Sequence, residues 1–427
     1  MNRVEYLVIG AGITGLSFAN FVNSDDYLIL ESENEIGGYC RTIYRDEFVW
    51  DYSGHFFHFR DPEIKRFFAE RVHSDDVVTV NKATKILYQG SLIDYPFQKN
   101  IHQLEKDEFI DCLFDLYFRD QLEYSNFKEM LYSKFGRSIS EKFLIPYNEK
   151  LYACDLETLE SDAMGRFFPY ADLGDVISNF KQGNNTSYND TFMYPKKGAM
   201  QFVRALQEGL DTDKICTGER VLAIDIHRKK VQTSKRTITY ENLITTIPFP
   251  ILLDMVGLEE YVDRFSWNKV LVFNIGFDRK GTEGLHWVYV PEEKFRFYRV
   301  GFYDNILGTD KMSLYVEVGL SKDAEVDVEQ EFDEVVMDLR KSGLISDEQI
   351  VCYEPVLMDP AYVHRTEESN ELFQNISSAL RARGIYTIGR YGGWKYCSIE
   401  DNIIEAKQTA ELFNLMSFHK CGGIDLG

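Results

Sequence analysis

The sequence predicts an α/β fold in which one parallel sheet is assembled from separate segments of the chain, with a second region inserted between them. The apolar run Tyr6–Ile9 leads directly into Gly10, and near the other end Ile385–Ile388 leads in the same way into Gly389. Short continuous apolar runs are typical of parallel strands that are buried on both faces. The chain has 427 residues, which is enough for about two to three domains and a large core.

The glycines after the first strand follow the pattern Gly-x-Gly-x-x-Gly, and a predicted helix and a second strand ending at Glu31 come after them. In this pattern Gly10 permits a tight turn, Gly12 lets the backbone approach a pyrophosphate, and Gly15 lets the helix pack closely on the strand. The helix N-terminus attracts phosphates, and Glu31 can accept hydrogen bonds from ribose hydroxyls. The segment therefore predicts a Rossmann-like dinucleotide-binding unit.

Hydrophobic periodicity predicts the other elements in chain order. Helices are expected over residues 16–22, 107–118 and 141–143, around Tyr147, and over residues 202–210, 328–339 and 399–415. Strands are expected over residues 27–30, 221–226, 230–232, 243–246, 270–275, 287–290, 313–318 and 385–388. The polar stretch Asp172–Asp190, which contains Gly183-Asn184-Asn185-Thr186-Ser187, predicts a mobile loop.

These elements divide the chain into five stretches. Residues 1–78, 195–260 and 381–427 are expected to form the dinucleotide-binding domain, and residues 79–194 a helical substrate-binding region. Residues 261–380 are expected to form an antiparallel sheet that completes the substrate-binding part. The first domain is therefore discontinuous, and the substrate domain is a mixed helical and antiparallel-sheet insertion.

Charge excludes several classes of function. Lys and Arg number 47 and Asp and Glu number 69, which gives a net charge of −22. A field of that sign repels nucleic acids and anionic membrane surfaces, so an anionic ligand would need a few well-placed Arg or Lys side chains. No apolar run approaches the roughly 18 residues of a membrane span, and the N-terminus does not resemble a signal peptide.

The pattern of cysteines and the lack of catalytic motifs both bear on where the chemistry comes from. The seven cysteines are odd in number, and none forms a Cys-x-x-Cys pair. This pattern supports neither a metal cluster nor a disulfide framework, so we expect reduced thiols in a cytoplasmic protein. The sequence also holds no convincing Ser/His/Asp arrangement and no paired-carboxylate motif. We therefore expect a bound cofactor to carry the chemistry.

Three later motifs indicate which dinucleotide is bound. Gly37-Gly38, followed by Arg41, resembles the second motif of the amine-oxidase-like FAD flavoproteins, in which an arginine supplies charge near the cofactor phosphates. Residues 243–248 and residues 388–390 resemble the later FAD motifs of the same superfamily. Taken alone, Gly37-Gly38 is also compatible with an ordinary turn. Together the motifs favour FAD over NAD.

Several further segments resemble the UDP-galactopyranose mutases, especially their eukaryotic branch. Residues 54–58, Gly-His-Phe-Phe-His, resemble the histidine loop that lies against the isoalloxazine ring of FAD. Residues 95–101, Tyr-Pro-Phe-Gln-Lys-Asn-Ile, resemble the segment that grips uridine. Residues 146–153 resemble the helix that completes the uracil pocket. Aromatic rings and an amide at these places would stack on a base and pair with its edge.

Two blocks resemble the part of the mutases that binds phosphates. Residues 287–292 and 297–300 resemble a strand pair that carries a tyrosine and an essential arginine, here Tyr289 and Arg299. A planar guanidinium is well suited to fork onto a pyrophosphate. The block that ends at Tyr396 resembles the C-terminal flavin motif, in which this tyrosine contacts the substrate phosphates.

The resemblance assigns three groups of residues by position. The catalytic group is Arg299, Tyr289, Tyr396, Arg166 and His58. The FAD-binding group is Gly10, Gly12, Gly15, Glu31, Ser32, Gly37, Gly38, Arg41, Gly54, His55, Val221, Gly389 and Arg390. The substrate-binding group is Tyr95, Phe97, Gln98, Tyr147, Asn148 and Tyr152.

Three positions depart from the mutase pattern. A second substrate arginine should follow the uracil-pocket helix near Phe167 or Tyr170, and neither is an arginine, so that Arg166 is the nearest candidate. Tyr152 stands where the family usually has a tryptophan. Ser398 replaces an aspartate of the bacterial branch.

The resemblance implies an FAD-dependent isomerase that contracts the pyranose ring of a UDP-sugar to a furanose, for the synthesis of cell-surface polysaccharide. It implies that only reduced FAD is active, with its N5 attacking the anomeric carbon and expelling UDP, and with NADPH, NADH or another reductant supplying the electrons. Two other functions stay open, namely an amine or porphyrinogen oxidase and a non-catalytic protein that binds FAD or a nucleotide sugar. The oligomeric state also stays open, a homodimer included.

Overall fold

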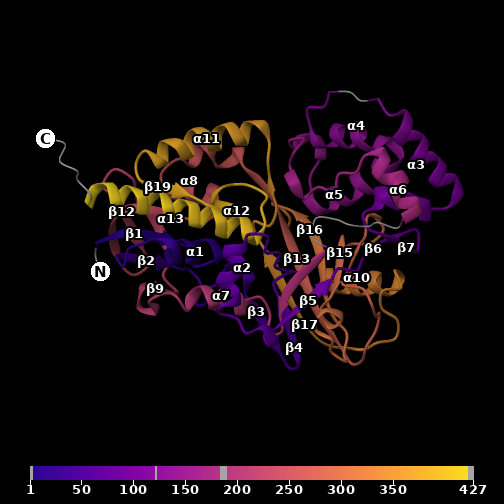
Figure 1. Cartoon of the computed structure of the whole chain (residues 1–427), viewed down its shortest axis with the longest axis horizontal. Helices are drawn as coiled ribbons and strands as arrows, with labels where there is room; N and C mark the ends of the chain where they lie inside the picture. Colours follow the sequence, from indigo (N-terminus) through magenta and orange to yellow (C-terminus); the bar gives the residue numbers. More distant parts are fainter. Residues whose placement is uncertain (1–2, 121–122, 183–189, 422–427) are drawn as a thin grey trace.

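A computed structural model describes residues 3–120, 123–182 and 190–421 of the chain. Figure 1 shows a sheet with helices on both faces in one half of the molecule, and in the other half a second sheet with a group of helices beside it. Both chain ends lie in the first half (Figure 1). The predicted α/β class is confirmed.

The first sheet is assembled from the beginning, the middle and the end of the chain. Its strands are β1 (Arg3–Ile9), β2 (Tyr27–Leu30), β9 (Ile215–Cys216), β10 (Val221–Asp225), β11 (Lys230–Thr233), β12 (Thr237–Thr245) and β19 (Ile385–Thr387). β1 pairs in parallel with β2 and β12, and β12 pairs in parallel with β19. The predicted sheet from separate segments of the chain is therefore present, and its core is parallel, while β10 and β11 extend it through antiparallel pairings.

Helices cover both faces of this sheet because successive strand residues point to opposite sides. Tyr6 and Val8 pack against α1 (Ile13–Phe21), α2 (Pro62–Ala69), α7 (Met200–Gln207) and α13 (Ile399–Cys421). Leu7 and Ile9 belong to a second buried cluster with α8 (Phe249–Met255) and α11 (Glu367–Arg381). The result is a three-layer unit whose central strands are apolar on both faces, as their sequence indicates.

The second sheet is mainly antiparallel. In spatial order it contains β17 (Ile350–Met358), β13 (Ser266–Phe277), β16 (Ser313–Ser321), β15 (Arg299–Phe302), β14 (Trp287–Tyr289), β6 (Thr84–Tyr88) and β7 (Ser91–Asp94), with β18 (Val363–His364) beside β13. α10 (Val328–Lys341) packs on this sheet, and α9 (Tyr303–Leu307) follows β15. β6 and β7 belong to the stretch 79–194, for which we expected a helical region. These residues are strands because β6 pairs in parallel with β14 and so extends the second sheet.

Two small two-stranded ribbons complete the strand set. β3 (Thr42–Arg45) pairs with β4 (Phe48–Asp51), and β5 (Val77–Asn81) pairs with β8 (Thr191–Pro195). β5 and β8 are the strands through which the chain enters and leaves the helical region.

The helical region contains α3 (Lys106–Phe118), α4 (Phe127–Ile139), a π-helical turn over Ser140–Leu144, α5 (Ile145–Tyr152) and α6 (Leu173–Gln182). The prediction of a loop over Asp172–Asp190 is wrong for its first part, which is α6. Val176 is fully buried and Phe180 packs on the core, so a helical face of apolar residues outweighs the polar composition. The Gly183–Ser187 part of that prediction lies outside the described residues.

Candidate active site

A cavity of about 580 Å³ lies at the carboxyl ends of β1, β2 and β12. Residues that end these strands line it, among them Gly10, Glu31 and Thr246. In open parallel sheets ligands bind at this edge, where the loops diverge. This space is called the cofactor cavity below.

The glycine turn after β1 has the geometry that a close approach to a ligand requires. Gly10 has a φ of +101°, which is a left-handed conformation that favours glycine. A Cβ on Gly15 would lie 2.0 Å from the carbonyl oxygen of Gly10, so α1 can pack against the turn only without a side chain there. The Glu31 carboxylate accepts a hydrogen bond of 2.9 Å from the Ala11 amide, which holds the turn from below.

The second glycine pair packs directly on the first turn. The Gly37 amide donates to the Ala11 carbonyl at 2.8 Å. Gly37 and Gly38 both have positive φ, +112° and +56°. The Arg41 guanidinium donates to the Gly38 carbonyl at 2.9 Å and faces the cofactor cavity. Other predicted cofactor residues on the wall of this cavity are Gly12, Ser32, Gly54, His55, Val221 and Arg390.

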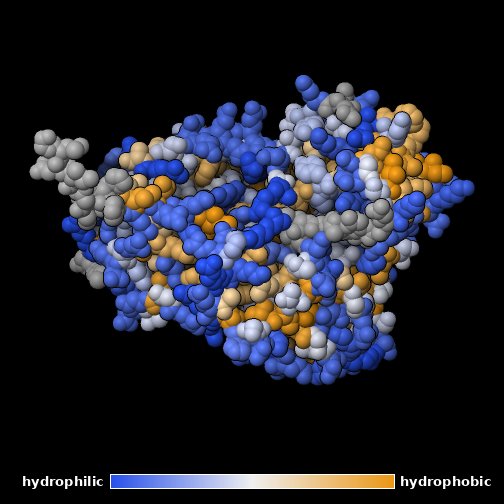
Figure 2. All heavy atoms as spheres, viewed as in Figure 1, coloured by the Kyte–Doolittle hydropathy of each residue, from blue (hydrophilic) through white to orange (hydrophobic). Residues whose placement is uncertain are grey.

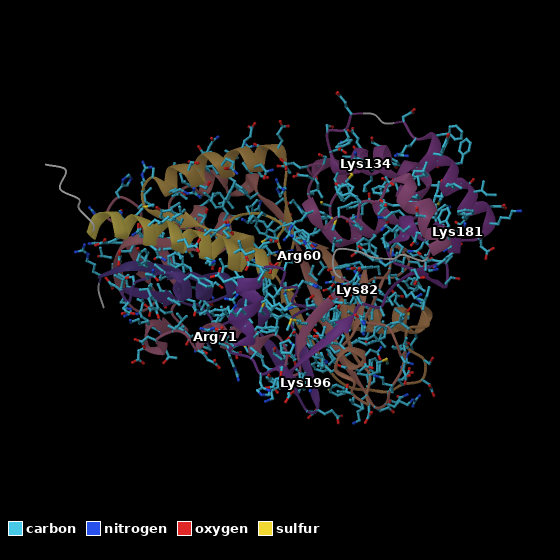
Figure 3. The ribbon with its side chains drawn as sticks, in the orientation of Figure 1. Arg60, Arg71, Lys82, Lys134, Lys181 and Lys196 are labelled. Carbon is cyan, nitrogen blue, oxygen red and sulfur yellow. The ribbon has the colours of Figure 1, made fainter. Side chains whose placement is uncertain are left out.

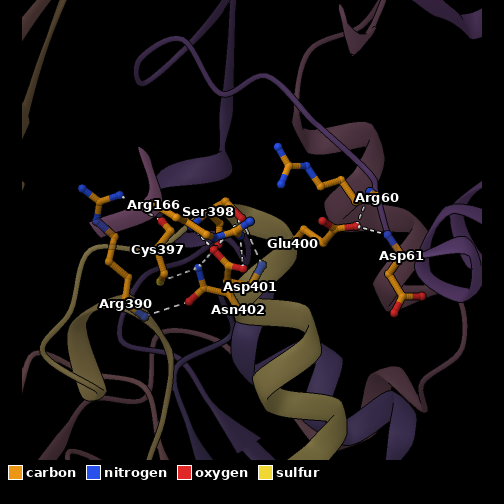
Figure 4. A network of polar contacts seen from close by, with 9 residues as sticks. All are labelled: Arg60, Asp61, Arg166, Arg390, Cys397, Ser398, Glu400, Asp401 and Asn402. Atoms are coloured by element: carbon orange, nitrogen blue, oxygen red, sulfur yellow. Dashed lines mark hydrogen bonds and ion pairs between the residues drawn. The ribbon is translucent and has the colours of Figure 1, made fainter. Parts of the chain in front are cut away.

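The C-terminal motif holds the start of α13 against this cavity (Figure 4). Gly389 has a φ of +85°, and the Arg390 amide donates to Asn402 Oδ1 at 2.8 Å. The Arg390 guanidinium lies 4.7 Å from the ring centre of Tyr396 and 5.2 Å from that of Tyr362. Its Nε atom is buried and has no hydrogen-bond partner within the described residues. An anionic group in the cavity would satisfy this nitrogen.

A second cavity, of about 280 Å³, adjoins the first and is called the substrate cavity. The two spaces share the wall residues Gly54, His55, Arg299, Tyr362, Arg390, Tyr396, Cys397 and Ile399. The wall of the substrate cavity carries Lys82, Arg299 and Arg390, and its described residues include no Asp or Glu. In a chain with a net charge of −22 this is a local reversal of sign.

Arg299, at the start of β15, is held by a buried carboxylate. Its Nη2 donates to Glu317 Oε1 at 2.6 Å, and its Nε donates to the other carboxylate oxygen. Ser53 Oγ also donates to Glu317, which is 1% exposed. The fork leaves Arg299 on the wall of both cavities with a fixed orientation.

Tyrosine rings form much of the remaining wall. Tyr289 lies 5.2 Å from Tyr95 and 5.1 Å from Tyr147, ring centre to ring centre. Tyr396 stacks on Tyr362 at 5.9 Å. Burial raises the pKa of Tyr95, Tyr147 and Tyr289, so these phenols stay protonated and can donate a hydrogen bond.

The two predicted histidines are placed differently. His55 lines both cavities, and burial, followed by the nearby Arg390 charge, lowers its pKa to about 4. Its Nδ1 lies 3.1 Å from the Ser53 carbonyl. His58 lines only the substrate cavity, with its Nδ1 2.9 Å from the Thr191 carbonyl, and burial lowers its pKa to about 4 as well. His55 is therefore the residue of the pair that reaches the cofactor cavity.

Four residues of the predicted catalytic and substrate-binding groups lie off the cavity walls. Phe97 is fully buried and stacks on Phe143, and Gln98 is buried with its amide donating to the Pro169 carbonyl. Tyr152 is 1% exposed and packs edge-on to Tyr362. These three buried residues support the wall of the substrate cavity without being part of it. Their predicted direct contact with a ligand stays a prediction that this arrangement does not favour.

Arg166 is the fourth, and an ion pair holds it outside. Its guanidinium pairs with Asp401 at the start of α13, as Figure 4 shows. Asp401 also accepts a hydrogen bond of 2.8 Å from the Ser398 amide. In this arrangement Arg166 joins the helical region to the first domain, and a direct substrate contact is not part of it.

Among the wall residues that were not predicted from the sequence, three matter for the charge and the stacking in the cavities. Glu317 faces Arg299 across the β15–β16 pairing, and the only signal for it was an acid at an inward position of an apolar strand. Tyr362 follows a loop and gave no signal. Lys82 follows β5 and lies below the helical region (Figure 3), and its ammonium is 5.0 Å from the Tyr95 ring centre. Burial lowers the pKa of Lys82 to about 8.

The walls of the cofactor cavity fit FAD. A glycine turn that admits no side chain, an acid at the end of β2 and an orphaned arginine nitrogen match the ribose and diphosphate of a dinucleotide. The sequence model of the family described as flavin containing amine oxidoreductase matches residues 13–412. The chain belongs to this family. Its cofactor is FAD, as the glycine motifs predicted.

Solved structures of two other proteins share the fold, and a curated relative is similar in sequence. A reduced UDP-galactopyranose mutase superposes with a TM-score of 0.90 and 24% identity, covering 96% of this chain and 94% of that one. A protein described as a putative protoporphyrinogen oxidase from Exiguobacterium superposes with a TM-score of 0.77 and 18% identity, covering 97% and 99%. The coproporphyrinogen III oxidase of Staphylococcus aureus is 21% identical over 323 residues, 65% of this chain and 68% of that protein.

Two features are absent from the part of the chain that the structure describes. Across residues 3–120, 123–182 and 190–421, no helix combines the length and apolar character needed to cross a bilayer. The same residues hold no group of three or more His, Cys, Asp or Glu side chains that could hold a metal ion.

Proposed function

We propose that this flavoprotein is a UDP-sugar mutase, which interconverts the pyranose and furanose forms of a UDP-hexose, with UDP-galactose as the first candidate. The observation that carries the proposal is the substrate cavity, which pairs a cationic wall with an aromatic end and adjoins the cofactor cavity. An oxidase acting on an apolar amine has no use for such a wall. The product would be a furanose donor for polysaccharide synthesis.

The cationic wall suits a diphosphate. Arg299 lies on this wall with its Nε and Nη2 atoms bonded to Glu317, which fixes the orientation of the guanidinium, and Lys82 adds a point charge on the same wall. No carboxylate among the described wall residues of the substrate cavity opposes them, and Glu317 is occupied with Arg299 and Ser53. Two cations on a low-dielectric wall bind a diphosphate far more strongly than they would at an open surface.

The aromatic end suits a uracil ring. Asn148 is 2% exposed, and its Oδ1 has no hydrogen-bond partner within the described residues, while its amide nitrogen donates to the Leu144 carbonyl at 2.6 Å. A buried orphan acceptor requires a donor, and the imide N–H of uracil is one. Tyr147 and Tyr95 offer ring faces on the same wall.

Each part of the chain has a defined task in this reaction. FAD, when bound and reduced, supplies the nucleophilic electron pair for the anomeric carbon. Arg299 orients the diphosphate and stabilises the negative charge that builds up on it as the sugar bond breaks. Tyr289 stays protonated because burial raises its pKa, so it can donate a hydrogen bond. Tyr396 and Tyr362 stack on each other in the cavity wall, and these rings exclude water. His55 is neutral at physiological pH, with Nδ1 directed at the Ser53 carbonyl, which leaves Nε2 as an acceptor.

A second candidate is the oxidation of a porphyrinogen. The similarity to coproporphyrinogen III oxidase and to a putative protoporphyrinogen oxidase favours it. The cationic wall would then bind propionate groups, and molecular oxygen would accept the electrons. This reaction changes the redox state of the substrate, whereas the mutase reaction does not.

One experiment separates the two. Purified protein is reduced with dithionite under anaerobic conditions and incubated with UDP-galactopyranose, and the nucleotide sugars are separated by chromatography. We expect furanose product from reduced protein and none from oxidised protein. Oxygen uptake by oxidised protein with coproporphyrinogen, together with no furanose under any condition, would establish the oxidase. UDP binding without turnover would indicate a non-catalytic binding protein.

A further inference from the structure

The outer face of α3 is apolar and exposed, and it lies away from both cavities. Ile110, Phe114, Tyr117 and Phe118 are 49%, 59%, 64% and 62% exposed. Their spacing places them on one side of the helix. We call these four residues the aromatic ridge. Figure 2 shows the corresponding hydrophobic surface over α3 at the end of the helical region.

The ridge is an organised surface. The rings of Phe114 and Phe118 lie 4.6 Å apart, and those of Tyr117 and Phe118 lie 4.8 Å apart. Single exposed apolar residues are ordinary, whereas a contiguous set of three rings and an isoleucine marks an interaction site. Aromatic residues are also the side chains most enriched at the centre of protein interfaces.

A hollow of about 550 Å³ opens beside the ridge, between α3 and α4. Phe114, Phe118 and Tyr132 form its apolar wall. Gly136 interrupts α4 with a φ of +73°, and a Cβ there would lie 2.5 Å from the Asp115 carbonyl oxygen. The two helices therefore pack tightly at Gly136, and the hollow beside this contact has room for a side chain from a partner that lies along the ridge.

The charge around the ridge is mainly negative. The exposed acids are Asp107, Asp111, Asp120 and Glu123, and the hollow is also lined by Asp115 and Glu129. Of the two arginines on the wall of the hollow, Arg137 is already paired with Glu141 at 2.9 Å. An apolar strip with acids on its rim is complementary to an apolar strip with bases on its rim.

We propose that the aromatic ridge and its hollow dock a cationic amphipathic helix of a partner protein. Helix-in-groove recognition places apolar side chains at i, i+4 and i+7 on such a face. A second copy of this chain would bring one acidic rim against another, and an anionic membrane would be repelled by a protein of charge −22. Neither alternative matches the rim as well as a partner that carries Lys or Arg.

The test uses the full-length flavoprotein and two synthetic peptides of about 18 residues with the same leucines at i, i+4, i+7 and i+11. One peptide carries Lys beside the leucines, and the other carries Glu. Binding is measured by fluorescence anisotropy at physiological salt. The ridge variant is Phe114→Ser with Phe118→Ser. The matched control is Leu222→Ser with Met337→Ser, two side chains of 50% and 48% exposure on β10 and α10.

The expected result is that the Lys peptide binds wild type and the control variant alike and binds the ridge variant at least tenfold more weakly, while the Glu peptide does not bind. Flavin content and UDP affinity should be equal in all three proteins, because the ridge lies off the cavity walls. Equal binding of both peptides, equal loss in the control variant, or no binding of the Lys peptide would overturn the proposal. So would a dimer that the ridge variant dissociates, or ridge-dependent binding to phosphatidylcholine vesicles, since these identify other occupants.

Discussion

Arg299 and Glu317 form an ion pair whose carboxylate is buried, with side-chain exposures of 20% and 1%. The Glu317 carboxylate accepts hydrogen bonds from Nε and Nη2 of Arg299 and from the hydroxyl of Ser53. Removing one partner of a buried pair leaves the other charge uncompensated, which costs far more than the pair contributes. A diphosphate beside Arg299 would be a second anion in contact with the same guanidinium. The role of Glu317 would then be to hold that guanidinium in one orientation.

Arg299→Ala should weaken UDP binding. Losing a desolvated, charge-assisted contact costs about 2–5 kcal/mol, so we expect a dissociation constant raised by roughly 30-fold or more. Because the single variant leaves Glu317 unpaired, Arg299→Ala with Glu317→Gln is measured beside it by isothermal titration calorimetry. Unchanged UDP affinity in both folded, yellow variants would remove Arg299 from the substrate site.

Asn148→Leu tests the base end independently of the phosphates. The substitution keeps the approximate volume and removes the buried Oδ1 acceptor. Leaving the uracil imide unpaired costs on the order of 1–3 kcal/mol, so UDP affinity should fall by roughly 5-fold to 100-fold. Tripolyphosphate, titrated as an inhibitor of UDP binding, should bind as it does to wild type. A parallel loss for both ligands would mean that the variant disturbs the whole cavity.

The helix α5 carries three wall residues of the substrate cavity, Tyr147, Asn148 and Leu151, and a lysine of the same helix anchors it to the second sheet. Lys150 Nζ donates to the carbonyls of Val290, Glu292 and Phe297 at 2.9, 3.1 and 2.5 Å. These carbonyls belong to the connection between β14 and β15, which carry Tyr289 and Arg299. Lys150 therefore ties α5 to the strands on the other side of the substrate cavity, in addition to the ring contact between Tyr147 and Tyr289.

Lys150→Met should destabilise the protein and weaken UDP binding together. The substitution keeps an unbranched chain and leaves three carbonyls without their donor, which should lower the free energy of unfolding by about 2 kcal/mol or more. Lys128→Met on α4 is the matched control, since its pair with Glu157 lies near the surface and should contribute less than about 1 kcal/mol. Urea-induced unfolding and a UDP titration of each variant check both effects. Equal effects in the two variants would contradict this role for Lys150.

The stability of the whole molecule should depend on pH through its buried histidines. His364 is 5% exposed, with Nε2 2.9 Å from the Tyr152 carbonyl, and burial lowers its pKa to about 4. The unfolded chain takes up a proton at an ordinary histidine pKa of about 6.5, whereas the folded chain does so only near 4. The contribution of this group is therefore fully present above pH 6.5 and is lost as the pH falls toward 4.

His364→Gln should remove this dependence. Between pH 7.5 and 4.5 the free energy of unfolding of wild type should fall relative to the variant, by at most about 1.4 kcal/mol per pH unit. The measurement is urea unfolding of both flavin-loaded proteins at several pH values. The difference at pH 7.5 reports packing alone and serves as the baseline. A difference that stays constant with pH would show that His364 titrates normally in the folded protein.

Local sequence signals sufficed for the first domain and for the cofactor. The Gly-x-Gly-x-x-Gly turn, the acid at Glu31 and the strand before Gly389 are consecutive or nearly consecutive residues whose backbone conformation is dictated locally. α6 shows the limit of that approach. Its polar composition predicts a loop, while the burial of Val176 against residues far away in the chain makes it a helix.

The types of side chain at the candidate site could be predicted from the sequence, whereas the individual residues that line the cavities could be predicted only in part. Arg299, Tyr289 and Tyr396 line a cavity as their motifs indicated, because they belong to short segments that face it. Phe97, Gln98 and Tyr152 have the right chemistry but point into the core, and Arg166 is drawn away by Asp401.

By itself the sequence determined an α/β flavoprotein with a discontinuous FAD domain, because glycine turns and strand patterns are local properties. The tertiary structure alone decides which charges and rings line the two cavities. Lys82, which follows β5, lies on the substrate cavity, Glu317 of β16 lies on the cofactor cavity, and Tyr362, before β18, lies on both, although these segments are far apart in sequence. Such neighbours follow from strand pairing and packing over long separations, and a linear pattern of residue types does not encode those distances.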